Sequence, residues 1–575
     1  MKRHDSRFDL EFIASPGVTL GLFFVVAACS TWPLPLHFRT ALPTGTSHIG
    51  TVPMLNAWTY WWNGQSASSG LADYWNAPIF HPVTGTLAFS EPQSITCLFA
   101  PLRKALTPIE IHNCYLLLTL ALNGWTSFRM LRKVGVSLFL AFLGGLAIAW
   151  LPIGWRNLEA IQLLALWPFC LACTSAVDCL NLDDKTIRWW PYVSLGFWSG
   201  LLAYCCLYWF AFSLVTLWPT VTVLVAVHGV RSARKGWFPQ LAVAAATCAL
   251  VSIPIVYSMH SITSEHELTR SIDTVRVLSA EPTDWLYTAG NTWWNPSPPA
   301  GVTPLCPGSL RILIVALVLL TVGRVKDSPI PPFAVFLLGG ICLLSFAFSF
   351  GANLQWRQYN IWEILCSKLP GFAGIRSPFR FAYFVQLTTI LLAVIGLERL
   401  RARVYAQTAA NFRSSWFFYI LLASATAFET IPNRSQLCYP PVRSMSWHDY
   451  VADNVPKGQA IVCLPVASDG TEQSQERETR WMMHATLHGV PILNGYSGFT
   501  PKHYADVRRQ LRSPENMVDQ LLELFESHSL ALVVVDRNTL SSAALRALEE
   551  QTSIVPVFQE SRFVIYEPAI SNRDQ

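Results

Sequence analysis

The chain has 575 residues, of which 52% are hydrophobic and only 13% are charged. Soluble domains carry about 25% charged residues, so too little polar surface remains to cover several soluble domains of this length. The formal net charge is +5, and no basic stripe with interleaved aromatic residues appears, which excludes nucleic acid as an expected partner. Composition therefore predicts an integral membrane protein in contact with the lipid bilayer.

Apolar segments that could cross about 30 Å of hydrocarbon recur along the first three quarters of the chain. We predict about 11 transmembrane helices, forming an α-helical polytopic domain over residues 1–432. The predicted spans are 16–36, 110–128, 136–153, 159–180, 189–206, 207–229, 237–257, 309–323, 331–350, 379–398 and 415–431.

Basic residues test this arrangement, because short cytoplasmic loops collect Lys and Arg. With a cytoplasmic N-terminus, eleven crossings place five basic clusters inside: 129–133, 185–188, 231–235, 324–326 and 399–403. The same count predicts a multi-pass protein of the inner (plasma) membrane with its C-terminal region outside. One alternative concerns Cys29, because Val26–Cys29 resembles the end of a lipoprotein signal whose cleavage would remove the first span.

The loops on the predicted outer side are long and rich in tryptophan: 37–110, 258–308 and 351–378. Trp58, Trp61 and Trp62 fall on one helical face, for which we favour anchoring at the membrane interface over stacking on a sugar. The long loops place the working surface of the protein on the outer face.

Residues 433–575 alternate strand-like and helix-like patterns. Strands are predicted at 460–466, 530–536, 553–558 and 562–567, and helices at 504–525 and 540–550. This alternation indicates an extracytoplasmic α/β domain. It contains no nucleotide-binding or nucleophile-elbow motif, so independent catalysis is not expected.

Ionisable residues are sparse within the predicted spans and concentrated in the outside loops. Asp178, Glu398 and Glu429 lie near span ends. Ion-coupled transporters need charged groups near mid-membrane, where charge is costly. The distribution therefore favours an enzyme acting on a lipid-borne substrate over a transporter of lipids or polysaccharides, which remains the third alternative.

Several motifs resemble those of GT-C-type bacterial integral membrane glycosyltransferases. They are Trp75–Pro82 (WNAPIFHP), Thr86–Glu91 (TLAFSE), Pro304–Gly308 (PLCPG), Leu369–Phe381 (LPGFAGIRSPFRF) and His488–Phe499 (HGVPILNGYSGF). The resemblance implies transfer of a hexose or pentose from a polyprenyl-phosphate-linked donor to a cell-envelope glycan or lipid acceptor. It also implies a catalytic acid in the first outside loop.

The sequence departs from this family at one position. Most such enzymes begin the first outside loop with a Gly-Asp pair, whereas this chain has Gly50-Thr51. The departure favours a second hypothesis, in which the chain is a catalytically inactive membrane scaffold or a glycan-binding relative.

Sugar transfer from a phosphate donor requires a carboxylate to take the acceptor proton and cations to stabilise the leaving phosphate. Glu91 is the first candidate for the base, and Asp73 is the second. Arg376 and Arg380 are four residues apart, so a continuous helix would place both on one face as donor phosphate-binding residues. The alternative role for these arginines is contact with lipid headgroups.

Arg156, Asp284 and Tyr496 are candidates for contacts to the acceptor or within the loops. Simpler alternatives are a surface pair between Arg156 and Glu159 and a structural turn around Tyr496. His48, His81 and Glu91 could ligate a divalent cation, but their spacing matches no metal motif, so neither a metal site nor another cofactor is predicted. His484 and His488, one helical turn apart, are interpreted as surface histidines.

Overall fold

The computed structural model describes residues 15–46, 48–181, 188–231, 236–289, 298–321, 330–357, 359–369, 371–407, 412–431, 434–467 and 470–569. Contacts divide the chain into two compact units. The bundle unit comprises Met1–Pro35, Tyr115–Ser261 and Thr269–Ser435, and the α/β unit comprises Leu36–Cys114, Ile262–Leu268 and Gln436–Gln575. The domain boundary at 432/433 stays a prediction, whereas the contacts group the loop 37–110 with the C-terminal region.

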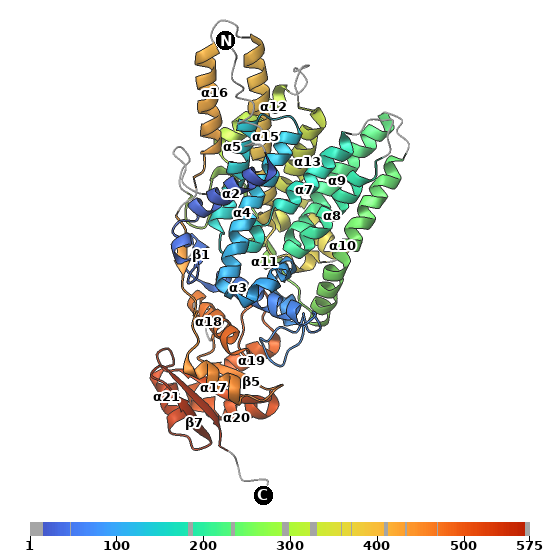
Figure 1. Cartoon of the computed structure of the whole chain (residues 1–575). Coiled ribbons are helices and arrows are strands. Elements are labelled where there is room, and N and C mark those ends of the chain that lie inside the picture. The colour runs from blue at the N-terminus through green and yellow to red at the C-terminus, as the bar shows by residue number, and fades with distance from the viewer. Residues whose placement is uncertain are drawn as a thin grey trace. The chain divides into compact units, whose positions relative to one another are not determined.

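Each of the predicted spans overlaps a helix (Figure 1). The helices are α2 (Pro16–Ser30), α4 (Pro108–Lys133), α5 (Leu138–Ala149), α7 (Trp167–Leu180), α8 (Trp190–Cys205), α9 (Leu207–Arg231), α10 (Trp237–Glu265), α12 (Ser309–Thr321), α13 (Pro332–Ser349), α15 (Ala382–Gln407) and α16 (Phe412–Ala427). Among the described residues, six helical segments are long and apolar enough to cross a membrane: 138–156, 161–180, 207–229, 237–265, 332–349 and 378–402. The chain is therefore a multi-pass membrane protein, and the count of eleven spans stays a prediction.

Helix α15 is the buried centre of the bundle unit. The most apolar stretch of its segment, 378–402, is 100% buried, whereas that of α10 is 28% buried. Near its start α15 carries Gln386, whose amide donates to the carbonyls of Leu305 and Cys306 at 2.9 and 3.5 Å and accepts from the amide of Ile153 at 3.1 Å. A buried amide that satisfies three backbone groups fixes the loops around it. It thus ties the PLCPG motif and α6 (Pro152–Arg156) to the central helix.

A buried ion pair between Arg311 and Glu429 lies at the start of α12. Arg311 and Glu429 have side chains that are 0% exposed, with 3.6 Å between Nε and a carboxylate oxygen. The same carboxylate accepts from the backbone amides of Leu310 and Arg311 at 2.7 and 3.2 Å. The guanidinium donates to Thr426, Pro307 and Ala427 carbonyls and to the Thr430 hydroxyl. Arg311 falls inside the predicted span 309–323, so that span does contain a charge.

The core of the α/β unit is a four-stranded sheet of order β5-β6-β8-β7. Its strands are β5 (Ala460–Leu464), β6 (Leu530–Asp536), β7 (Ile554–Gln559) and β8 (Phe563–Pro568). Strands β5 and β6 are parallel, and the other pairs are antiparallel. The helices are α17 (Ser446–Asn454), α18 (Glu472–His488), α19 (Lys502–Gln510), α20 (Met517–Ser527) and α21 (Ser542–Glu549).

The predicted helix 504–525 is wrong as a single element, because α19 ends at Gln510 and α20 begins at Met517. Pro514 lies between them, and the residue before a proline is disfavoured in the helical region. Ser513 accordingly has φ −88° and ψ 118°. The strand predicted at 530–536 has the bounds of β6.

Two sequence motifs extend this sheet. Ile461 bonds to the 491–493 segment through Ile461 N to Pro491 O at 3.0 Å and Leu493 N to Ile461 O at 2.8 Å. That segment in turn pairs with the WNAPIFHP motif, because Phe80 N and His81 N donate to Asn494 O and Ile492 O at 3.1 and 3.2 Å. The sheet is therefore continued beyond β5 by two extended segments: residues 491–494 lie next to β5, and residues 78–81 lie next to 491–494.

The tryptophan-rich helix α3 (Thr51–Ser68) also belongs to the α/β unit. Trp58 is 1% exposed and lies in the hydrophobic core of that unit, against which Trp61 and Trp62 are partly buried. The Trp62 indole donates to the Tyr74 carbonyl at 2.8 Å. The prediction of interfacial anchoring is therefore wrong for Trp58, which packs inside protein.

The interpretation of His484 and His488 as surface histidines is wrong, since they are only 9% and 6% exposed. Both lie on α18 and pack with His448 of α17 around the Trp447 ring, at centroid distances of 3.9 to 5.8 Å. Burial lowers the pKa of His448 to about 4 and that of His488 to about 3, and it lowers the pKa of His484 well below 6.5. All three rings are therefore neutral at pH 7.

Acidification is expected to destabilise the α/β unit. Below pH 6.5 the histidines bind protons in the unfolded state but stay neutral in the folded state. The stability present above that pH is therefore lost as the pH falls toward about 4. Three such groups give a slope of up to ~4 kcal/mol per pH unit. Hydrogen exchange of β5 in the intact protein, corrected for intrinsic rates, measures this slope, and His488→Phe should reduce it by about a third. An opening free energy that is constant from pH 7 to 5 would contradict the expectation.

Candidate functional site

Two arginines of the bundle unit interact with Tyr208, and a third interacts with one of them. The Arg380 guanidinium lies over the Tyr208 ring, with 4.6 Å between its central carbon and the ring centroid. Arg270 interacts electrostatically with both Tyr208 and Arg376. We name Arg270, Arg376, Arg380 and Tyr208 the arginine cluster. Cations over an aromatic face are stabilised by its quadrupole, so Tyr208 orients Arg380.

Contacts from three separate segments hold the arginine cluster. The Phe381 ring stacks on Phe212 of α9 with centroids 3.5 Å apart, one helical turn from Tyr208. Arg270 N donates to Ala373 O at 3.2 Å, and Phe379 N donates to Leu278 O at 3.2 Å. The loops 258–308 and 351–378 are thus joined at two points, one made by Arg270 itself and the other by the neighbour of Arg380.

Among the described residues, neither Arg376 nor Arg380 forms an ion pair with a carboxylate. The buried Nε of Arg380 has no hydrogen-bond acceptor there either. Burial, followed by the charge of Arg376, lowers the pKa of Arg270. Half-buried like charges are costly without a counterion, so this geometry is suited to an anion.

The prediction that Arg376 and Arg380 share a helical face is wrong. Arg380 lies in a short 3-10 helix, Pro378–Phe381, whereas Arg376 lies in the extended link before it. Ser377 has φ −128° and ψ 77°, because Pro378 disfavours a helical residue before it. The two side chains are instead linked by other residues: Arg376 interacts electrostatically with Arg270, and Arg380 lies over the Tyr208 ring. Arg270 was missed, because nothing in the local sequence links it to the 376–380 segment.

Arg156 and Asp284 are brought together in the bundle unit, where Arg156 also interacts electrostatically with Glu159 and Tyr383. The Asp284 carboxylate is 7% exposed and accepts from the backbone amides of Glu281 and Thr303 at 2.8 and 2.9 Å. It thereby caps the 3-10 helix Pro282–Leu286. Asp284 therefore stabilises the backbone of the loop 258–308.

Glu91, Asp73 and Tyr496 belong to the α/β unit. Glu91 is half-buried and follows Phe89, whose carbonyl accepts from Phe499 N at 2.9 Å. Asp73 is exposed in a turn. The environment of Glu91 is therefore the more ordered of the two, since its loop is bonded to the NGYSGF motif.

Tyr496 is half-buried, and its backbone amide donates to the Met482 sulfur at 3.3 Å. Within its motif, Asn494 has the larger structural role. The Asn494 side chain bonds to both the amide and the carbonyl of Cys463 in β5, at 2.7 and 2.9 Å. Gly495 faces the Phe80 ring so closely that an added Cβ would lie 2.7 Å from it. The motif is therefore a structural turn that accepts the WNAPIFHP segment.

At the position where the motif resemblance leads us to expect a Gly-Asp pair, Gly50 precedes α3 and Thr51 is its first residue. Thr51 is 5% exposed, and its buried hydroxyl has no hydrogen-bond partner among the described residues. The described residues also contain no group of three or more His, Cys, Asp or Glu side chains that could hold a metal ion.

No protein family profile matches the sequence, and no curated protein sequence matches it. Solved structures with a similar fold do exist. The arabinofuranosyltransferase AftD from Mycobacteria superposes with a TM-score of 0.54 at 12% identity over 98% of this chain and 42% of AftD. The archaeal oligosaccharyltransferase AglB from Archaeoglobus fulgidus, solved with an inhibitory peptide and a dolichol-phosphate, gives a TM-score of 0.48 at 13% identity, over 92% of this chain and 70% of AglB.

The chain thus spans less than half the length of AftD, and the likeness concerns the fold. It extends over nearly the whole of this chain, including both units. The resemblance predicted from the motifs is confirmed at the level of the fold, which this chain shares with the arabinofuranosyltransferase AftD.

Proposed function

We propose that this protein is a membrane glycosyltransferase that moves a sugar from a polyprenyl-phosphate donor to a cell-envelope glycan or lipid acceptor on the outer face of the membrane. The observation that carries the proposal is the arginine cluster, whose charge has no ion-pairing carboxylate on Arg376 or Arg380 in the described chain. The GT-C fold supports the same reaction class.

The chemistry of the donor explains why arginines are needed. When the bond between the anomeric carbon and the phosphate oxygen breaks, the departing polyprenyl phosphate gains negative charge. Guanidinium groups bind two phosphate oxygens at once and remain protonated throughout. Since Tyr208 orients Arg380 before the donor arrives, little reorganisation is required in the transition state.

The acceptor hydroxyl must lose its proton as it attacks the anomeric carbon. We propose Glu91 as the general base that takes this proton, with Asp73 as the second candidate. Support for Glu91 comes from its half-buried side chain and from the backbone bond that orders its loop. A fully solvated acid such as Asp73 is a less effective base, because water competes for its oxygens.

The test is a transfer assay in membranes, with polyprenyl-phosphate-linked hexoses and pentoses as donors. Glu91→Gln is expected to reduce transfer by about 10²–10⁴-fold, the usual contribution of a positioned base. Asp73→Asn keeps the same shape at an exposed turn and tests the second candidate, so a loss of that size in this variant alone would move the base to Asp73. Glu515→Gln, at an exposed acid of the same unit, is the control and is expected to change the rate by less than about threefold. Equal activity of Glu91→Gln and the intact protein would remove the assignment of Glu91.

The second hypothesis, an inactive scaffold or glycan-binding relative, is supported by Thr51, which lacks a carboxylate at the position the family uses. The same assay separates the two functions. An inactive relative transfers no sugar from any donor, whereas an enzyme with a displaced base loses transfer only in Glu91→Gln. Thr51→Asp should restore transfer in an inactive relative and leave an active enzyme's rate largely unchanged.

The proposal also requires the α/β unit to lie outside the cytoplasm. A cysteine introduced at the exposed Glu515, in a chain whose exposed Cys29 is replaced by Ser, should react with a membrane-impermeant maleimide in intact cells. Lys133→Cys, in a predicted cytoplasmic cluster, should react only after permeabilisation. The opposite pattern would invert the topology and remove the outer-face assignment.

A further inference from the structure

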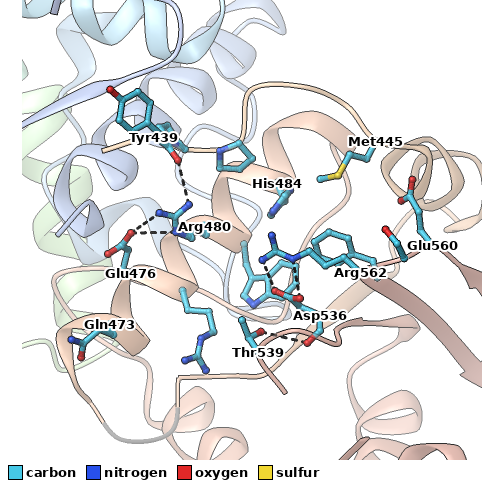
Figure 2. A pocket seen from close by; sticks show the side chains of 16 residues that line it. Tyr439, Met445, Gln473, Glu476, Arg480, His484, Asp536, Thr539, Glu560 and Arg562 are labelled. Atoms are coloured by element: carbon cyan, nitrogen blue, oxygen red, sulfur yellow. Dashed lines mark hydrogen bonds and ion pairs between the residues drawn. The ribbon is translucent and has the colours of Figure 1, made fainter. Parts of the chain in front are cut away.

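A pocket of about 640 Å³ lies within the α/β unit, at the carboxyl end of strand β6 (Figure 2). Its walls come from α18, from the Tyr439–Pro441 segment, and from the turn between β7 and β8. Ligands of α/β sheets commonly bind at the carboxyl ends of strands, and small-molecule pockets measure about 300–1,000 Å³. The pocket is therefore placed and sized for a small ligand.

Charges of both signs line this pocket in equal number: Arg477, Arg480 and Arg562 against Glu476, Asp536 and Glu560. Arg562 binds Asp536 through two bonds of 3.0 and 2.7 Å. Arg480 binds Glu476 at 2.8 Å and donates to the Tyr439 carbonyl at 3.3 Å. Figure 2 shows both pairs around the same hollow. Balanced charge argues against a phosphate or polyanion, which the three acids would repel.

The two ion pairs are also preorganised hydrogen-bonding groups. Arg480 and Arg562 have side chains that are 43% and 52% exposed, so N–H groups remain available after pairing. Glu560 has a buried oxygen, Oε2, with no donor among the described residues. A hydroxyl group can donate to such an oxygen and accept from a guanidinium, whereas an anion can only accept.

His484 adds a donor whose proton position follows from its neighbours. Met445 N donates to Nδ1 of His448 at 2.8 Å, so His448 carries its proton on Nε2. That nitrogen lies 2.9 Å from Nδ1 of His484 and donates to it. The neutral His484 ring therefore carries its own proton on Nε2, and this side chain lines the pocket.

Apolar surface completes the lining. Tyr439 is 51% exposed at the rim and is followed by Pro440 and Pro441. An exposed aromatic ring beside planar amide, guanidinium and carboxylate groups matches a pyranose or furanose ring, which has apolar C–H faces and hydroxyl edges. Neutral polyols thus fit every group that the pocket presents.

We propose that this pocket binds an uncharged saccharide unit of the acceptor glycan. The naming of that glycan as the acceptor rests on the glycosyltransferase function proposed above, whereas saccharide binding itself does not. In this arrangement the α/β unit captures the growing glycan through hydroxyl contacts to Arg480, Arg562 and His484 and through stacking on Tyr439.

The experiment uses the full-length protein in lipid nanodiscs. Binding of neutral di- and trisaccharides of hexoses and pentoses is compared with that of a uronic-acid disaccharide and of inorganic phosphate by saturation-transfer NMR. We expect neutral saccharides to bind and Tyr439→Ala to weaken them about tenfold or more, as truncation of a binding aromatic does. Tyr359→Ala, an aromatic 56% exposed in the bundle unit, is the matched control and should leave binding unchanged.

Arg480→Gln provides a second variant that keeps hydrogen-bonding capacity at a half-exposed position and should also weaken binding. No saccharide binding at millimolar concentration, equal binding by Tyr439→Ala, or preference for phosphate or the uronic acid would overturn the proposal. In the transfer assay, Tyr439→Ala should raise KM for the acceptor about tenfold with kcat nearly unchanged. Saccharide binding without any sugar transfer would refute the enzyme but not the pocket, whereas transfer with unchanged KM would refute the pocket but not the enzyme.

Discussion

Replacing Arg380 with Gln is expected to reduce sugar transfer by about 10²–10³-fold, the loss typical when one preorganised group that stabilises transition-state charge is removed. The side chain has no ion-pairing carboxylate in the described chain and is oriented by Tyr208, so its removal takes one oriented guanidinium away from the developing phosphate charge. Arg380→Lys keeps the charge but loses bidentate geometry, so it should retain partial activity. Initial rates in membranes measure both variants.

Arg276→Gln is the matched control, because Arg276 lies in the same outside loop as Arg270 but pairs with Asp273 at 2.8 Å on the surface. It should transfer sugar at nearly the normal rate. If Arg380 only contacts lipid headgroups, Arg380→Gln would keep its transfer rate and its binding of polyprenyl phosphate in native mass spectrometry. That result would remove the arginine cluster as the donor site.

Breaking the Arg311–Glu429 pair is expected to cost about 3–5 kcal/mol of stability, because either single change leaves a buried charge without its partner. Both side chains are 0% exposed, and together they bond to the start of α12 and to the residues that end α16. We therefore expect Arg311→Met and Glu429→Gln to lower the thermal midpoint of the purified protein sharply. The double variant Arg311→Met/Glu429→Leu should recover much of the loss, since no lone charge remains.

Lys133→Met tests the specificity of this effect. Lys133 pairs with Asp178 where the two side chains are 40% and 33% exposed, and such pairs contribute about 0–1 kcal/mol. Its midpoint should stay close to that of the intact protein. Single variants of Arg311 and Glu429 with the same midpoint as Lys133→Met would show that water or lipid compensates the buried charge.

The sequence predicted elements well wherever hydrophobic pattern alone decides structure. The run 530–536 is apolar on both faces, as a central strand requires, and it became β6. Pattern was insufficient at 504–525, where apolar spacing continues through Pro514 although the backbone cannot continue as helix. The same effect of Pro378 separates Arg376 from the 3-10 helix that carries Arg380.

The candidate site was predictable only in part, because its arginines converge through tertiary contacts. Arg376 and Arg380 lie in a recognisable motif, whereas Arg270 is placed by a backbone bond to Ala373 that no local pattern encodes. The burial of Trp58 was likewise not predictable from its helical spacing, since an interfacial helix and a packed helix show the same periodicity.

The pairing of residues 78–81 with 491–494 has a practical consequence for expression of fragments. A polypeptide beginning at residue 433 would lack residues 78–81, which pair with the 491–494 segment. It would also expose Gly495 where the Phe80 ring normally lies. Unpaired strand edges pair with other chains, so such a fragment should aggregate. Its insolubility would reflect a missing neighbour from far upstream, and soluble material should return when a peptide spanning residues 75–91 is supplied.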